Sequence, residues 1–220
     1  MKRTKLAMRT LPRYTRGEEI MNMVTHIVGG ALGIAALILG VIKATGTAAV
    51  IGTVIFGVTM IALYTLSSTY HGMRPCIGKK VLQILDHCTI YFLIAGTYTP
   101  ILLGGFLPVY PNICWWLLGF EWGLCLIAAT LTAIDLDIFG VFSMICYIGM
   151  GWAIILFIPQ CMTVMTAPGF YILLAGGLAY TVGAVLYGIG NKVPWMHSVF
   201  HIFVVAGSLL QFLAIYLYVL

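Results

Sequence analysis

The stretch MHSVFHIFVVAGSLLQFLAIYLYV, residues 196–219, combines the two features that decide the fold of this chain. It is long and apolar enough to cross the hydrocarbon core of a bilayer as a helix. It also begins with His197 and His201, although an imidazole inside hydrocarbon is costly. The stretch therefore predicts a membrane helix with a functional site at one end.

The whole chain has the composition of a polytopic membrane protein. Of its 220 residues 62% are hydrophobic and 8% are charged, and the mean hydropathy is +1.07. This composition excludes an ordinary soluble domain. No internal repeat is visible, and we predict an all-α integral membrane bundle of seven helices. They are expected near residues 21–42, 47–70, 84–104, 113–134, 138–158, 169–190 and 196–219.

The basic residues predict the orientation of the bundle. Six of the eleven Lys and Arg lie in the first sixteen residues, which is typical of a tail beside anionic lipid and not of a nucleic-acid surface. A cytosolic N-terminus places ten of the eleven on the cytosolic side and only Lys43 outside. We therefore predict a multi-pass protein of the cell membrane with its C-terminus outside. Residues 1–17 would form a basic cytosolic tail, and 18–220 a single seven-helix domain.

Two further readings of the sequence are weaker. The apolar run 21–42 follows a basic start, as in a signal peptide, but it is too long for a signal core and fits a membrane span better. The six cysteines are scattered, without a C-x-x-C pair, and behave as small hydrophobes in apolar stretches. A bridge between Cys114 and Cys161 on the outer face is the alternative.

In this orientation most of the unusual polar residues share the cytosolic depth. His71 ends the second predicted helix there, and His197 and His201 begin the seventh. The four-residue spacing of His197 and His201 puts these two rings on one helix face, about 6 Å apart along the axis. A third imidazole completes a zinc site with one open position, the catalytic arrangement. The alternative is interfacial histidines that face headgroups or bond backbone carbonyls.

Asp86 and Ser67 are the expected catalytic residues. Such a zinc lowers the pKa of its bound water to about 7, and Asp86 lies at the right depth to accept the proton. Ser67 lies one helical turn before His71. Alternatively, Asp86 is an interfacial carboxylate near Lys79 and Lys80, and the serine bonds its own backbone. His87 points about 100° away from Asp86 and stays outside the predicted ligand set.

Two more groups of polar residues lie in predicted helices. Glu19, Asn22 and His26 form one stripe of the first helix, where they could orient the ligands; the alternative is a polar helix start in the headgroup zone. Glu121 is expected near the middle of the fourth helix, which makes it a functional candidate. It could instead be protonated and hydrogen-bonded, or lie nearer the outer interface.

Taken in order along the chain, five motifs resemble those of the hemolysin III family, relatives of the progestin and adipoQ receptors and, more distantly, of alkaline ceramidases. The motifs are Glu19-x-x-Asn22-x-x-Thr25-His26, Ser67-x-x-x-His71, Leu85-Asp86-His87, Ala95-Gly96-Thr97-Tyr98-Thr99-Pro100 and His197-x-x-x-His201. The resemblance implies that the three matching histidines bind zinc, that Asp86 holds the metal-bound water and that Ser67 lies beside it. It also implies an N-terminus inside. Glu121 belongs to none of these motifs.

The sequence thus predicts a zinc-dependent hydrolase that acts on an amide or ester bond of a membrane lipid, with Zn²⁺ as its cofactor and no nucleic-acid partner. One alternative is the pore-forming, cytolytic activity that the hemolysin name implies. A pore should have polar residues at all depths, whereas here the middle and outer thirds hold little besides Glu121 and scattered Thr and Tyr. The other alternative is a receptor or regulator of membrane lipid state with a structural zinc, which needs the same ligands.

Overall fold

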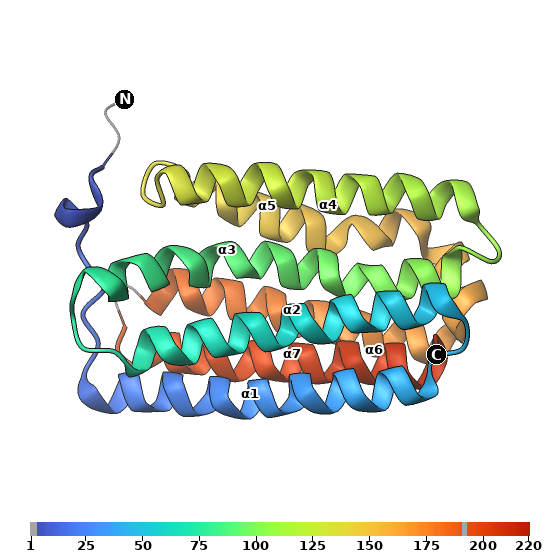
Figure 1. The fold of residues 1–220 in the computed structure, drawn as a ribbon, viewed down its shortest axis with the longest axis horizontal. Helices are drawn as coiled ribbons and strands as arrows, with labels where there is room; N and C mark the ends of the chain where they lie inside the picture. The colour runs from blue at the N-terminus through green and yellow to red at the C-terminus, as the bar shows by residue number, and fades with distance from the viewer. Residues whose placement is uncertain (1–3, 191–192) are drawn as a thin grey trace.

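The computed structural model describes residues 4–190 and 193–220, and these form an all-α bundle whose long helices share one axis (Figure 1). Lys2, Arg3, Asn191 and Lys192 lie outside the described residues. The predicted all-α class is confirmed. The elements are η1 (Leu6–Met8), α1 (Arg16–Lys43), α2 (Thr47–Gly72), α3 (Ile77–Pro100), the π-helical η2 (Ile101–Phe106), α4 (Pro111–Ile134), α5 (Gly140–Trp152), η3 (Ala153–Phe157), α6 (Ile158–Gly190) and α7 (Met196–Tyr218).

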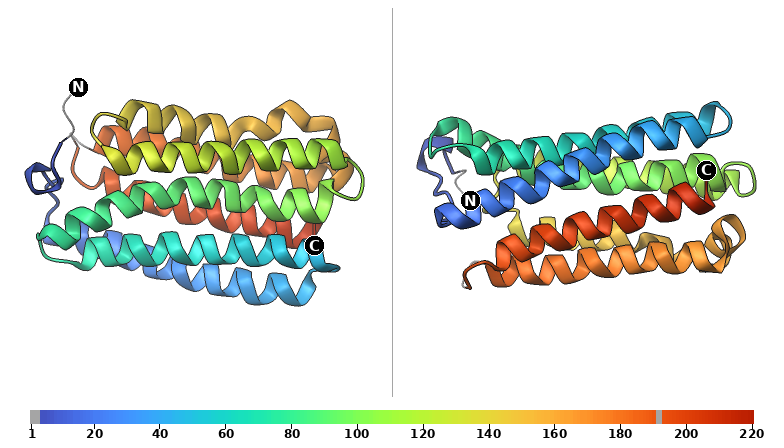
Figure 2. Two further views of the ribbon diagram at one scale, coloured as in Figure 1. Left: turned by 45° about the horizontal axis from the view of Figure 1, so that its top comes forward. Right: turned by 90° about the horizontal axis from the view of Figure 1, so that it is seen from below.

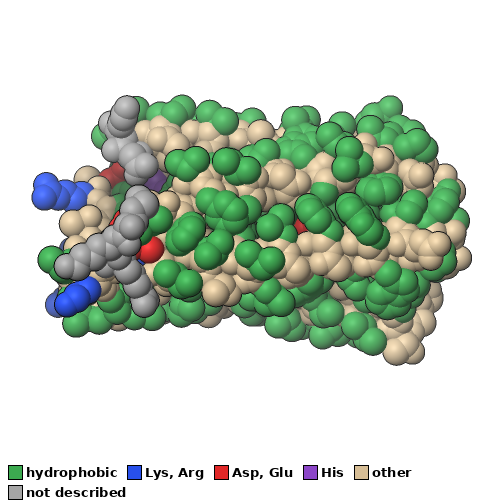
Figure 3. Space-filling model, turned by 90° about the horizontal axis from the view of Figure 1, so that it is seen from above, with side chains coloured by type: hydrophobic (Ala, Val, Ile, Leu, Met, Phe, Trp, Pro, Cys, Tyr) green, Lys and Arg blue, Asp and Glu red, His purple; other side chains and the backbone are tan. Residues whose placement is uncertain are grey.

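Six helical segments of the described chain are long and apolar enough to cross a membrane. On the face drawn in Figure 3, hydrophobic side chains cover the length of the bundle and the visible Lys and Arg side chains lie at one end. Lys43, in the last turn of α1, lies at the other end. This distribution is the one that lipid around the middle and water at the ends require. The chain is therefore a membrane protein. The six segments are Arg16–Lys43, Thr47–Gly72, Ile77–Phe106, Pro111–Ile134, Gly140–Gly190 and Met196–Tyr218.

The segment Gly140–Gly190, which contains α5, η3 and α6, folds back on itself. Its backbone leaves the helical region at Thr166 (φ 64°, ψ 166°). The Trp152 indole N–H donates a 3.0 Å hydrogen bond to the Thr181 hydroxyl, although these residues would be about 44 Å apart in one straight helix. Both views in Figure 2 show the bundle that results.

The predicted loop between residues 159 and 168 is too long, because α6 already begins at Ile158. Pro159 stands in the first turn of that helix, where a missing N–H costs nothing. The change of direction is instead concentrated at Thr166, two residues before Pro168.

The predicted starts of two helices are also wrong: both helices begin earlier in the chain, because capping residues and not the apolar runs determine where they start. Thr15 and Glu18 form a capping box, so α1 begins at Arg16 and not near 21. The Cys76 sulfur accepts from the Lys79 N–H, so α3 begins at Ile77 and not near 84. Asp86 therefore lies inside α3 and not at its start.

The core of the bundle is apolar and contains no disulfide among the described residues. Phe56, Met60 and Tyr64 of α2 are fully buried in one apolar cluster with Phe212 and Ile215 of α7. All six cysteines are free, and the pair considered for a bridge, on α4 and α6, is buried within the same cluster. The prediction of cysteines as small hydrophobes is confirmed for the five buried cysteines and is wrong for Cys76, which is exposed.

A close helix contact in this core gives a stability prediction. A Cβ added at Gly52 of α2 would lie 2.7 Å from the Pro100 Cα, a backbone atom that cannot move aside cheaply. We expect Gly52→Ala to destabilise the protein by about 1–3 kcal/mol through overpacking. The matched control is Gly123→Ala in α4, where nothing lies within 4 Å of the added Cβ, so stability should be unchanged or slightly higher. Thermal unfolding in detergent measures both, and equal midpoints would contradict the close packing.

Candidate metal centre

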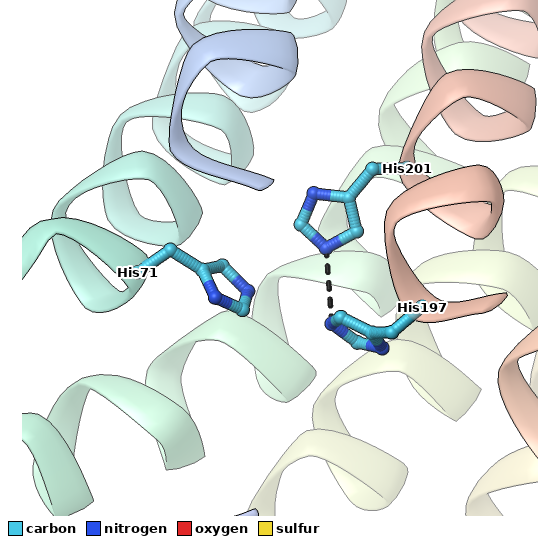
Figure 4. A group of neighbouring side chains, drawn as sticks. All are labelled: His71, His197 and His201. Atoms are coloured by element: carbon cyan, nitrogen blue, oxygen red, sulfur yellow. Dashed lines mark hydrogen bonds between the residues drawn. The ribbon is translucent and has the colours of Figure 1, made fainter. Parts of the chain in front are cut away.

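Three buried histidines meet at the basic end of the bundle. His71 comes from the last turn of α2, and His197 and His201 from the first turns of α7; their rings point toward one another (Figure 4). One ligand nitrogen of each lies within 4.8 Å of the others, and the Nε2 atoms of His197 and His201 are 3.1 Å apart. The three residues are 1–8% exposed, so water does not solvate these nitrogens freely. The structure thus brings together the three predicted ligands.

Hydrogen bonds at the opposite ring nitrogens fix two of these imidazoles. The His71 Nδ1–H donates to Glu19 Oε2 at 2.7 Å. The His201 Nδ1–H donates to the backbone carbonyl of Asn22 at 3.2 Å. In a neutral ring, both bonds put the proton on Nδ1 and leave Nε2 free to bind a metal ion; the buried His71 Nε2 has no hydrogen-bond partner among the described residues. This is the arrangement that orients histidines around a metal ion.

The donor set fits zinc. Zinc binds imidazole nitrogens at about 2.0–2.1 Å, so tetrahedral ligands stand about 3.4 Å apart. The 3.1 Å separation on α7 is close to that value, and an ion between the helices would draw the wider pairs together. Three converging imidazoles, with the buried His71 Nε2 unpartnered among the described residues, match the three-histidine ligand set of a catalytic zinc, which leaves a fourth position for water. Zinc itself remains a prediction.

The predicted stripe of α1 lies against this cluster. Glu19 accepts from His71 through one carboxylate oxygen and from Lys79 Nζ, at 2.5 Å, through the other. The Asn22 side-chain oxygen accepts from the hydroxyl of Ser198 at 2.6 Å, which ties α1 to α7. The His26 ring stacks on His201 with centroids 3.8 Å apart. All three side chains are therefore in position to orient the ligands.

Asp86 and Ser67 line a cavity of about 720 Å³ that also touches His197 and His201. Ser67 is fully buried, and its hydroxyl oxygen has no hydrogen-bond partner in the described chain. The lysines offered as alternative partners of Asp86 bind elsewhere: one bonds Glu19 and the other, Lys80, donates to the backbone oxygen of residue 7. His87 stays outside the cluster, as expected, because its nitrogens bond the Gln83 carbonyl and the Tyr187 hydroxyl.

The N-terminal tail, residues 4–15, covers the cytosol-predicted side of this site. Tyr14 stacks on the His197 ring with centroids 4.8 Å apart and planes inclined by 22°. Burial raises the pKa of the Tyr14 phenol above its usual range, so the hydroxyl stays protonated. The Thr4 N–H donates to the Asp135 carboxylate at 2.7 Å, which lowers the pKa of that carboxyl, and Arg9 pairs with Asp137 at 3.7 Å. Sequence reasoning treated the tail only as an orientation signal and missed these contacts.

Sequence reasoning also missed Glu18. Besides closing the capping box on Thr15, its Oε1 accepts the Trp195 N–H at 2.7 Å. Trp195 is the residue before α7 and has a left-handed backbone (φ 67°), so this bond holds a strained turn just ahead of the histidines. The signal was readable, because Thr15-x-x-Glu18 is a capping-box sequence.

Deeper in the bundle, a polar network contradicts the expectation of a nearly featureless middle. The Tyr64 hydroxyl donates to Ser208 Oγ at 2.6 Å, and the Tyr180 hydroxyl lies 2.7 Å from the same oxygen. Gln211, one turn further along α7, donates to the Leu173 carbonyl. The two Tyr hydroxyls and Ser208 bond one another and so join α2, α6 and α7. Gln211 Oε1 has no hydrogen-bond partner in the described chain, and Tyr180 and Gln211 both line the cavity described above.

Fold and site together define an all-helical membrane protein with a buried three-histidine cluster at one end. The chain belongs to the hemolysin III family: the family described as "Haemolysin-III related" matches residues 14–212. "Hemolysin-3" of Bacillus cereus is 40% identical over 206 residues, 92% of each chain, and the "Hemolysin-3 homolog" of Bacillus subtilis (strain 168) is 36% identical over 93% of this chain and 96% of its own. The resemblance found in the motifs is confirmed.

A more distant relative is the human "Monocyte to macrophage differentiation factor", which is 26% identical over 172 residues, 74% of this chain and 68% of its own. It supports the distant relation to the progestin and adipoQ receptors. No solved structure matches the chain.

Proposed function

We propose that this protein is a zinc-dependent hydrolase that cleaves an amide or ester bond of a membrane lipid. The observation that carries the proposal is the convergence of three buried imidazole nitrogens, one with no partner, beside a cavity that also holds a carboxylate and a free hydroxyl. Structural zinc sites almost always have four protein ligands, whereas three ligand atoms converge within 4.8 Å of one another here, which favours a catalytic over a structural zinc. The relation of the family to alkaline ceramidases favours an amide bond by analogy.

Each residue then has a role. His71, His197 and His201 would hold the ion, and Glu19 would keep the His71 ring in the required tautomer. Zinc, when bound, supplies Lewis-acid activation of water and of a carbonyl group. Asp86 would accept the proton of the attacking water and return it to the leaving group. The free Ser67 hydroxyl would donate a hydrogen bond to the developing oxyanion.

The shape of the cavity supports a lipid substrate. From the histidines it continues between α3, α5, α6 and α7 to Ile101, Phe170 and Gln211. Gln211 is fourteen residues after His197, which is about 21 Å along α7. A volume of about 720 Å³ lies within the usual range for small-molecule sites. A long, largely apolar cavity with its polar groups at one end suits a molecule with a polar head and an apolar chain.

The experiment that tests the function is a lipid-hydrolysis screen of purified protein with ceramides, acyl-amides and esters, each with and without a chelator. We expect hydrolysis that the chelator stops and that added zinc restores. The same preparation in liposomes should not conduct ions. Ion leak after metal removal, without hydrolysis of any lipid in the screen, would favour the pore that the hemolysin name suggests and would end the hydrolase proposal.

For the membrane topology we propose seven crossings in a bacterial cell membrane, with the N-terminus and the histidine cluster on the cytosolic side. Three observations support this. The segment Gly140–Gly190 folds back and so crosses twice. At the basic end, Thr4 and Arg9 of the tail contact Asp135 and Asp137, and Trp195 contacts Glu18. Finally, α1 begins at one end of the bundle and α7 finishes at the other (Figure 1).

The native Cys76 tests this orientation. It is exposed in the turn after α2, whereas the other five cysteines are buried. A membrane-impermeant maleimide should therefore label the protein in inside-out vesicles and not in intact cells, and Cys76→Ser should abolish that labelling. In the Cys76→Ser background, Leu220→Cys should be labelled in intact cells. Labelling of Cys76 from outside would place His71 on the outer face and reverse the proposed orientation.

A further inference from the structure

Glu121 is a buried carboxyl that the proposed reaction does not use. It lies near the middle of α4, ten residues after Pro111 and thirteen before Ile134, or about 15 and 20 Å from the two helix ends. The residue is 0% exposed, and neither carboxylate oxygen has a hydrogen-bond partner in the described chain. The position in the middle of α4 rules out a carboxylate near the outer interface. The lack of a hydrogen-bond partner in the described chain rules out the other alternative, a protonated acid that is hydrogen-bonded to a neighbour.

Within the part of the chain that the structure describes, no basic side chain pairs with this carboxyl. The sequence holds no Lys or Arg between Lys80 and Lys192, a stretch that includes all of α4, α5 and α6. None of the three ion pairs in the described chain involves Glu121. A carboxylate without a partner in a low-dielectric interior is strongly disfavoured, whereas the neutral acid is tolerated.

The ionisable groups around Glu121 cannot stabilise a negative charge either. They are Tyr98 on α3 and Cys125 on α4, with Cys161 of α6 next to Tyr98. The Tyr98 hydroxyl proton is already committed, because it donates to the Met150 carbonyl at 2.9 Å while its oxygen accepts the Ile154 N–H at 2.9 Å. A hard metal cation would need several oxygen ligands, which a lone carboxylate among thiols does not supply.

Glu121 does not line the 720 Å³ cavity, but Tyr98, one of its ionisable neighbours, does. We propose that Glu121 is an intramembrane proton-binding site, which holds a proton at neutral pH and exchanges it with the cavity beside Tyr98. The ligand is the proton itself. The site is distinct from the histidine cluster and does not depend on the proposed hydrolysis.

Infrared spectroscopy of the purified protein tests the proposal directly. At neutral pH we expect the carbonyl stretch of a neutral carboxylic acid in the wild type, its absence in Glu121→Gln, and a shift when the wild type is moved to D₂O. The matched control is Asp137→Asn, which removes a carboxylate whose side chain is 67% exposed and should leave the band unchanged. A carboxylate band in place of the acid band would overturn the proposal. Loss of the acid band on addition of Na⁺ would also overturn it, because it would show a cation site.

A second measurement does not depend on the spectrum. A proton that stays bound in the folded state but leaves in the unfolded state, above about pH 4.3, weakens folding as pH rises. Between that pH and the pKa of the carboxyl in the folded protein, we expect the wild-type folding equilibrium to fall about tenfold per pH unit relative to Glu121→Gln. Zinc content should be equal in the two proteins. Parallel pH profiles of unfolding would contradict a bound proton even if both proteins fold well.

Discussion

The double variant His197→Ala, His201→Ala should retain no zinc, whereas the wild type should hold about one zinc per chain. The two rings supply two of the three converging nitrogens, and His71 alone cannot hold the ion against water and chelators. Metal analysis of detergent-purified protein, after passage over a chelating resin, measures the difference. The expected loss is essentially complete, which makes this one of the two largest effects that the site predicts.

The matched control for this experiment is His87→Ala. His87 is an imidazole near the same cavity, but both of its nitrogens are already hydrogen-bonded, to Gln83 and Tyr187. Its loss should leave zinc at the wild-type level. Full metal occupancy in the double variant, or equal loss in His87→Ala, would show that the three converging histidines are not the metal ligands.

The second large effect concerns Asp86→Asn. Asparagine keeps the shape of the side chain and most of its hydrogen-bonding capacity, but it cannot accept a proton from water. Zinc content and thermal stability should therefore stay at the wild-type level while lipid turnover falls by about 10²-fold or more, the usual effect of losing a general base. A turnover assay with the substrate found in the screen, run beside metal analysis on the same preparation, measures both.

This variant also separates the three functional readings. If the zinc is structural in a receptor, Asp86→Asn has no turnover to lose and behaves as the wild type. If the protein is a pore, ion leak in liposomes ignores both Asp86 and chelators. Asp137→Asn is the control, since it removes a largely exposed carboxylate at the same end of the bundle and should keep turnover. Wild-type turnover in Asp86→Asn would remove this residue from the proposed reaction.

The general plan of the protein could be predicted because it depends on local signals. Length and hydropathy mark the apolar helices, and the basic residues sort their ends, so His71 and His197 could be assigned to one depth although 126 residues separate them. The same reasoning put the stripe of Glu19, Asn22 and His26 at this depth, but it left open whether the stripe faces the histidines or the headgroups. The contacts with His71 and His201 come from the structure.

What could not be predicted depends on contacts between distant residues or on backbone geometry. The sequence predicts a reversal between residues 158 and 169, but it does not indicate that the change of direction lies at Thr166, because a single φ/ψ change is enough to produce it. The bond from Thr4 to Asp135 joins residues 131 apart, and the pair of Lys79 with Glu19 joins residues 60 apart. Nothing in either local sequence indicates which partner each residue takes. For Glu121, the sequence indicated the depth but not the absence of any partner.

The tail across the histidine site also has a practical consequence for how the protein is prepared. A bulky affinity tag fused close to Thr4 would crowd the bond from its N–H to Asp135, and Tyr14 further along is stacked on a proposed ligand. A bulky tag there would compete with those contacts, and zinc measured on such a preparation would be too low. Leu220 lies at the other end of the bundle, close to Gly40 and far from the cluster (Figure 1). An affinity tag fused after Leu220 should therefore leave the histidine site undisturbed.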